Sequence, residues 1–117
     1  MRHHNKVKKF GREKNQRVAL MQSLARSLIL LGRIETSEAK AKALRPYVEK
    51  LVTKARDITL PKHRQILATL RNRKDATTKL IQEIAPKYKD RKGGYIRIIK
   101  LPPRKTDSAK MALIEFV

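Results

Sequence analysis

The sequence contains no cysteine and no tryptophan, and it has only two phenylalanines and three tyrosines among its 117 residues. The lack of cysteine excludes disulfide bonds and thiolate metal sites, and it fits a reducing compartment. With so few aromatic residues, the chain has no ladder of exposed rings of the kind that reads single-stranded nucleic acid. No apolar run approaches the length of a membrane span. The chain is long enough for one domain and too short for two ordinary ones.

Acidic residues are also scarce, with 10 Asp and Glu against 30 Lys and Arg, so the net charge is +20. Self-repulsion at this charge density opposes compaction. Such a charge indicates a polyanionic partner, with nucleic acid as the first candidate and an anionic membrane surface as the second. The alternative interpretation is a well-solvated surface that has no partner.

The positive charge begins in the first seventeen residues, "MRHHNKVKKFGREKNQR", of which seven are Lys or Arg. Val7 and Phe10 are their only sizeable apolar side chains after Met1. Because such a segment cannot pack a core by itself, residues 1–16 are predicted to form a basic extended arm. Residues 17–117 are predicted to form a single α+β domain.

The apolar stretch "VALMQSLARSLILLG" follows the arm and imitates a secretory signal peptide. Its polar residues Gln22, Ser23 and Arg26 fall on one helical face, whereas a secretory apolar region is apolar on all sides. The stretch is therefore read as an amphipathic helix over residues 18–31, whose apolar stripe continues to Leu31 and which Gly32 ends. A basic, amphipathic organellar transit peptide stays open as an alternative.

The middle of the chain predicts further helices. Residues 33–37 are predicted to form a short strand or extended link, and Ser37 is a candidate N-cap for the next helix. The apolar stripe of this helix runs from Leu44 to Ala55 and places Leu51 at its centre, facing the core. We expect this helix to kink at Pro46, although Pro46 could instead open a separate helix. Thr59 and Pro61 indicate a third helical start.

Asp75 is a candidate cap of a fourth helical segment, and Pro86 is expected to end it. The β-branched stretches "GGYIRIIKL" and "KMALIEFV" predict a β-hairpin around the loop "PPRKTDSA". The predicted fold class is α+β, with a basic N-terminal arm and about four helices packed on a small sheet that includes the C-terminal β-hairpin.

Catalytic groups are sparse. The three histidines, His3, His4 and His63, form no recognisable catalytic grouping, and no glycine-rich phosphate loop is present. The N-terminal amine and His3 could wrap Cu(II) or Ni(II), but we prefer a contact of His3 with RNA or solvent. The sequence therefore predicts no enzyme, no metal site and no cofactor.

Basic clusters recur in the arm, in the third helical region, in "KYKDRKGGYIRIIK" and in the hairpin loop. Charges on several faces favour a protein embedded in folded RNA over one that docks a single helix in a DNA groove. Tyr47 and Phe116 are assigned to the core, whereas Tyr88 and Tyr95 are candidates for stacking on a base. The residues predicted to bind RNA are Arg2, His3, Lys6, Lys8, Lys9, Arg12, Lys14, Arg17, Lys40, Arg45, Arg71, Arg73, Arg91, Lys92, Tyr95, Arg97, Lys100, Arg104 and Lys105.

Several stretches together resemble one known family. They are Met1-Arg2-His3, Phe10-Gly11-Arg12, "IETSEAKAKALRPYVEKLVTKA", "RKGGYIRIIKL" and "DSAKMALIEFV". In this colinear order, over nearly the whole chain, the sequence resembles the seventeenth protein of the bacterial large ribosomal subunit. It departs from the family at Gln16, where a His is usual, at Pro46, which is often basic, and at Thr106, where a Gly is common.

The resemblance implies a non-catalytic structural constituent of the large subunit that binds and stabilises its ribosomal RNA near the exit of the nascent-chain tunnel. It implies neighbouring ribosomal proteins, including the thirty-second, and a bacterial cytoplasmic ribosome rather than an organellar one. No membrane partner and no homo-oligomer are expected. A free nucleic-acid-packaging protein is the alternative, and a basic protein that acts on membranes is a third class.

Overall fold

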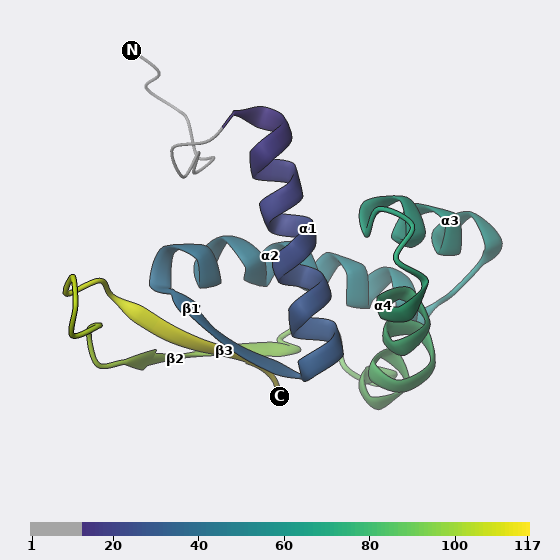
Figure 1. Cartoon of the computed structure of the whole chain (residues 1–117). Coiled ribbons are helices and arrows are strands. Elements are labelled where there is room, and N and C mark those ends of the chain that lie inside the picture. The colour runs from purple at the N-terminus through teal and green to yellow at the C-terminus, as the bar shows by residue number, and fades with distance from the viewer. Residues whose placement is uncertain (1–12) are drawn as a thin grey trace, which may run out of the picture.

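The computed structural model describes residues 13–117, so the expectations for residues 1–12 lie outside the described part of the chain. Helices lie on one side of a small antiparallel sheet, which confirms the predicted α+β class (Figure 1). The helices are α1 (Lys14–Leu31), α2 (Glu38–Arg56), α3 (Leu60–Thr69) and α4 (Lys74–Lys79), and α4 continues into the π-helical stretch η1 (Leu80–Ile84) and the 3-10 turn η2 (Ala85–Tyr88). The strands are β1 (Arg33–Ser37), β2 (Ile96–Leu101) and β3 (Met111–Phe116).

The last strand, β3, lies at the centre of the sheet and pairs antiparallel with both β1 and β2. The predicted C-terminal hairpin is therefore confirmed, and residues 33–37 form a true strand rather than a link. Ile114 is opposite Ile34 on one side and Ile98 on the other, and this row lies on the helix-covered face. Since side chains alternate along a strand, the neighbouring row around Glu115 lies on the opposite face.

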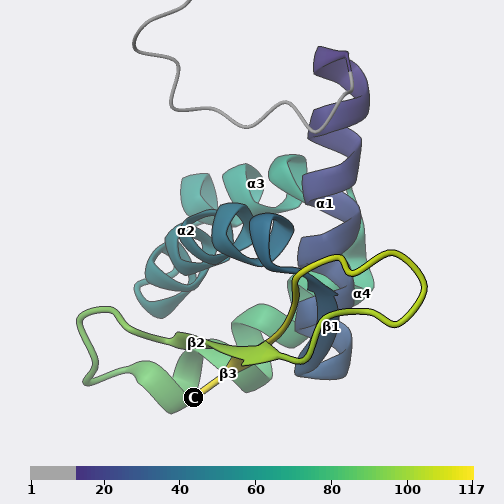
Figure 2. The same cartoon turned by 90° about the vertical axis from the view of Figure 1, so that its left-hand side faces the viewer.

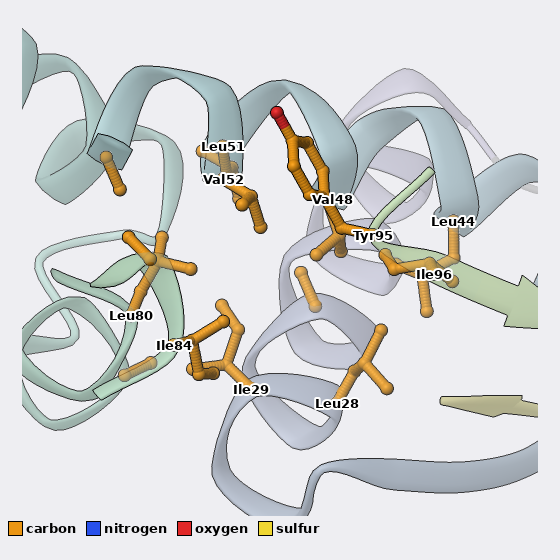
Figure 3. Close-up of a cluster of buried hydrophobic side chains, with 14 of the residues drawn as sticks. Leu28, Ile29, Leu44, Val48, Leu51, Val52, Leu80, Ile84, Tyr95 and Ile96 are labelled. Carbon is orange, nitrogen blue, oxygen red and sulfur yellow. The ribbon is translucent and has the colours of Figure 1, made fainter. Parts of the chain in front are cut away.

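The core forms where α2 crosses α1, the sheet and η1 (Figure 3). Leu51 is 2% exposed, which confirms its predicted inward position. Leu31 was predicted to continue the buried stripe of α1, and this is wrong because its side chain is 70% exposed. Ile29 continues the stripe from Ala25 and Leu28 instead.

Helix α1 begins earlier than predicted. Its first turn starts at Lys14, where the Arg17 amide donates to the Glu13 carbonyl at 2.9 Å. Residues 14–16 are therefore helical, and the predicted extended arm cannot reach residue 16. The other end of α1 follows the prediction, because Gly32 adopts a left-handed conformation (φ 82°) and its amide donates to Leu28.

Helix α2 runs unbroken from Glu38 to Arg56 with Pro46 inside it. The prediction of one continuous helix is therefore confirmed, and Pro46 does not open a separate helix. The Ser37 hydroxyl accepts the Lys40 amide hydrogen at 3.3 Å, as its predicted N-cap role requires. Pro46 has no amide hydrogen for the carbonyl of Lys42, one turn earlier. That carbonyl therefore lacks its usual helical donor.

The fourth helical segment corrects two predictions. Asp75 lies inside the first turn of α4, and Arg73 occupies the N-cap position instead. Pro86 does not end the helical path, because η1 widens first and the Ala85 amide donates to Leu80 five residues back. Pro86 then lies in the first turn of η2, where a missing amide hydrogen costs little.

Candidate nucleic-acid interface

Basic side chains of the described residues gather on four separate regions of the surface. Figure 1 places the hairpin loop and the turn between α3 and α4 on opposite sides of α1, whose start projects from a third side of the molecule. The regions are the α1 start (Lys14, Arg17), the α3–α4 turn (Arg71, Arg73, Lys74), the segment before β2 (Lys87, Lys89, Arg91, Lys92) and the hairpin (Arg97, Lys100, Arg104, Lys105). All are exposed except Arg17, which is half-buried.

The α3–α4 turn holds its basic residues on an ordered backbone. Arg71 and Asn72 have positive φ values of 54° and 59°, which cost of order 1 kcal/mol each for residues other than glycine. The Asn72 amide donates to Leu67 at 2.8 Å and the Arg73 amide to Leu70 at 3.1 Å. Because the buried side chain of Leu70 anchors this turn in the core, the side chains of Arg71 and Arg73 extend from a backbone of fixed conformation.

Carboxylates pair with part of the hairpin charge. Arg97 donates to Glu115 at 2.6 Å across the strands, and Arg104 lies 3.5 Å from Asp107 in the loop. The Arg104 amide also donates to the Ala109 carbonyl, which closes the loop. Exposed pairs of this kind contribute about 0–1 kcal/mol each, so a phosphate can compete with the carboxylate for the guanidinium.

A glycine pair, Gly93 and Gly94, positions the segment before β2. Both have positive φ, and the Gly94 amide donates to the Glu49 carboxylate of α2 at 3.1 Å. The same carboxylate accepts from Arg45 at 3.0 Å. Glu49 therefore links two predicted RNA-binding regions, because it holds both the Arg45 side chain and the backbone at Gly94, shortly after Arg91.

The structure overturns the prediction that Tyr95 contacts RNA. Its side chain is 1% exposed and packs against Tyr88, with ring centroids 5.3 Å apart. Its hydroxyl donates to the Arg91 carbonyl at 3.2 Å and accepts from Thr53 at 3.3 Å. Tyr88 is buried too, and its hydroxyl donates to the Val117 carbonyl. Because both rings are covered by protein, neither can stack on a base in this fold.

Sequence reasoning missed a groove of about 1040 Å³ between the start of α1, the start of α2 and the approach to β3. We call it the α1–α2 groove. Its signals in the sequence were Pro46 and Tyr47, which lie side by side in α2. Its lining consists of Lys14, Arg17, Val18, Met21, Ser37, Glu38, Ala39, Lys42, Ala43, Pro46, Tyr47, Ala109 and Lys110.

Tyr47 packs against the core as predicted, and so does Phe116. The Tyr47 hydroxyl donates to the Thr69 carbonyl at 3.3 Å, and burial raises the pKa of Tyr47 above its ordinary value. Lys40, another predicted contact, is half-buried in the first turn of α2. The predicted contacts Arg2, His3, Lys6, Lys8, Lys9 and Arg12 lie outside the described residues.

Two carboxylates with a lowered pKa, those of Glu38 and Asp75, are held in ion pairs. A hydrogen bond from Lys42 is the main cause that lowers the pKa of Glu38, and one from Arg26 lowers the pKa of Asp75. Within residues 13–117, no three His, Asp or Glu side chains come close enough to hold a metal ion. Over the same residues, no helix combines the length and apolar character needed to cross a membrane.

Known proteins resemble this chain over its whole length. The family described as "Ribosomal protein L17" matches residues 20–117. The "Large ribosomal subunit protein bL17" of Hydrogenobaculum sp. (strain Y04AAS1) is 56% identical over 118 aligned residues, which cover 100% of this chain and 99% of that protein. The proteins of the same name from Persephonella marina and Campylobacter jejuni subsp. doylei are 56% and 51% identical, and each alignment covers 100% of this chain and 95% or more of the relative.

Proposed function

The chain belongs to the ribosomal protein L17 family, and on that premise we propose that it is a structural, non-catalytic constituent of the bacterial large ribosomal subunit. In this role it binds large-subunit ribosomal RNA and stabilises its folded form. The proteins it matches carry a large-subunit name, and its net charge of +20 suits a polyanionic partner. The ribosome that holds it lies in the bacterial cytoplasm.

The observation that carries the RNA-binding part is the arrangement of exposed cations on ordered backbone on several sides of the molecule. The α3–α4 turn and the hairpin loop lie on opposite sides of α1 (Figure 1), and such an arrangement suits folded RNA, which surrounds a protein from several sides. Lys and Arg that contact phosphates release counter-ions and neutralise closely packed strands. The basic side chains of the protein therefore neutralise the phosphates of several RNA segments that lie close together.

The resemblance to the family supports two finer parts of the proposal. The basic arm that precedes α1 threads between RNA segments, where its Lys and Arg side chains contact phosphates. The protein lies near the exit of the nascent-chain tunnel and neighbours other ribosomal proteins, including the thirty-second. It joins the particle as a single copy, because two copies of such charge repel each other.

The RNA-binding proposal is tested by the salt dependence of binding to bacterial large-subunit ribosomal RNA. A variant with Arg71, Arg73 and Lys74 all changed to Gln should show a slope of log affinity against log salt that is about 2 smaller in magnitude, since each phosphate contact contributes about 0.7–0.9. The matched control is Asn72→Gly, which keeps the charge and relaxes a left-handed residue of the same turn. It should keep the wild-type slope.

A second charge variant, with Lys89, Arg91 and Lys92 changed to Gln, examines the segment before β2. If both charge variants keep the wild-type slope, the described surface does not bind phosphates and the proposal is wrong. Equal affinity of the wild-type chain for duplex DNA and ribosomal RNA would instead favour a free packaging protein.

A further inference from the structure

We propose that the α1–α2 groove receives an unpaired RNA base, so that the protein holds a single-stranded nucleotide there in addition to its phosphate contacts. This inference rests on the proposed function, because it takes the RNA partner from it. It adds a site of different chemistry to the basic surfaces, since the groove offers an apolar floor rather than charge alone.

The floor of the groove is apolar and open. Val18 is 47% exposed although it is a large aliphatic residue, and it faces the groove together with Met21 of the same helix. Ala43, Pro46 and Tyr47 of α2 supply the opposite wall. The start of α1, which carries one wall, projects beyond the other described elements in both views (Figure 1 and Figure 2).

The rim of the groove is positive. Lys14 and Arg17 on α1 and Lys110 before β3 form no ion pair with any described residue. Glu38 is the only acid in the lining, and Lys42 already binds it at 3.0 Å while Lys100 lies at 4.0 Å. Because Glu38 is the single acid among these cations, the rim keeps a net positive charge that complements the phosphates on either side of an inserted base.

One residue that lines the groove, Lys42, has a backbone carbonyl without its usual helical donor. Pro46 cannot supply the amide hydrogen that the Lys42 carbonyl would normally accept, and both residues line the groove. An exocyclic amine of a base, or a ribose hydroxyl, carries the donor that such a carbonyl accepts. The groove volume of about 1040 Å³ is at the upper end of the range for small-ligand sites, which leaves room for a nucleotide.

Other occupants fit less well. A second copy of the chain would bring a net charge of +20 to a rim that is already positive. An acidic, apolar segment of another protein would also match the charge of the rim. RNA is the better match, because one nucleotide supplies both the negative phosphate and a planar base for the apolar floor. Splayed bases are the parts of folded RNA that proteins commonly place against apolar and aromatic surfaces.

The test compares binding of the full chain to an unstructured single-stranded RNA oligomer and to the same oligomer made with abasic riboses. The wild-type chain should prefer the base-bearing oligomer about ten-fold, the lower part of the range for one stacked base. Ala43→Met fills the groove without changing charge, so it should abolish this preference and leave the affinity for the abasic oligomer unchanged. Ala68→Met, at an exposed position of α3, is the matched control and should keep the preference.

Tyrosine fluorescence supplies a second readout, because the chain has no tryptophan and Tyr47 is its only tyrosine that is not fully buried. The base-bearing oligomer should quench this emission in the wild-type chain and not in Ala43→Met. If Ala43→Met fails to fold, Val18→Gln removes part of the apolar wall at an exposed position and should lower the preference in the same way.

The outcomes separate this inference from the proposed function. Equal binding of the two oligomers by the wild-type chain, or an unchanged preference in a folded Ala43→Met, overturns the base site alone. Displacement by an acidic, apolar peptide but not by a base-bearing oligomer assigns the groove to a protein and also overturns it. Failure of the wild-type chain to bind either oligomer also overturns the base site alone, whereas failure to bind ribosomal RNA contradicts the proposed function itself.

Discussion

Replacing Leu51 by Ala tests whether α2 is the centre of the core. Leu51 is 2% exposed and belongs to the helix that contacts α1, α3, η1 and the sheet. In Figure 3 it lies beside Val52 on the face of α2 that looks toward Leu80. Elements packed on several sides of α2 leave little freedom for the surroundings to collapse into a new cavity.

The size of the effect follows from three lost carbon atoms. Their transfer from the core to water costs about 0.8 kcal/mol each, or roughly 2.4 kcal/mol together. A cavity term of about 24 cal/mol per Å³ adds to this where neighbours cannot move in. We therefore expect the free energy of unfolding to fall by about 3–4 kcal/mol, inside the range of about 2–5 kcal/mol for buried leucines.

Urea unfolding followed by circular dichroism measures this change, with the slope against urea unchanged. Leu31→Ala is the matched control, because the same atoms are removed from a side chain that is 70% exposed. It should change stability by less than about 0.5 kcal/mol. If Leu51→Ala also changes stability by less than about 0.5 kcal/mol, the packing face of α2 is assigned wrongly.

Three further predictions concern single contacts. Ser37→Ala should lower the free energy of unfolding by about 1 kcal/mol in urea, because the Lys40 amide loses its cap, whereas Ser37→Asn should retain most of it. Asp75 has a lowered pKa, so its pair with Arg26 stabilises the fold above the ordinary pKa of 3.8 and is lost as the pH falls through the folded value; Arg26→Gln should raise the Asp75 pKa in an NMR titration. Burial raises the pKa of Tyr47, so stability should be complete below pH 10.0 and fall as the pH rises beyond it, and a Tyr47→Phe variant should lose less stability there. If the Asp75 pKa in Arg26→Gln equals that in the wild type, the pairing of Asp75 with Arg26 is contradicted. If wild type and Tyr47→Phe lose the same stability at alkaline pH, the effect of Tyr47 burial is contradicted.

Local signals in the sequence predicted much of the fold. Gly32 ends α1 and Ser37 caps α2 because each acts on backbone groups within four residues of itself. The hairpin followed from β-branched runs on both sides of one loop. The pairing of β1 with β3 was not predicted, because it joins residues such as Ile34 and Ile114 that are far apart in the chain.

The candidate site was less predictable for the same reason. Tyr95 was assigned to RNA by its basic neighbours, but its environment is set by Thr53 and Tyr88, which tertiary packing brings to it. The α1–α2 groove likewise needs two helices to be placed side by side. The exposure of Arg71 and Arg73 could be expected from their charge, whereas their left-handed turn depends on how Leu70 is anchored.

The most direct test of the central claim is sedimentation of the native, untagged protein in a lysate of cells that express it. Gradient fractions washed with moderate salt are analysed by mass spectrometry, with other large-subunit proteins as the internal reference. We expect this protein to travel with the large subunit in the same proportion as those proteins. If it sediments as a free protein, or with the nucleoid, while the reference proteins stay bound to the subunit, the account is contradicted.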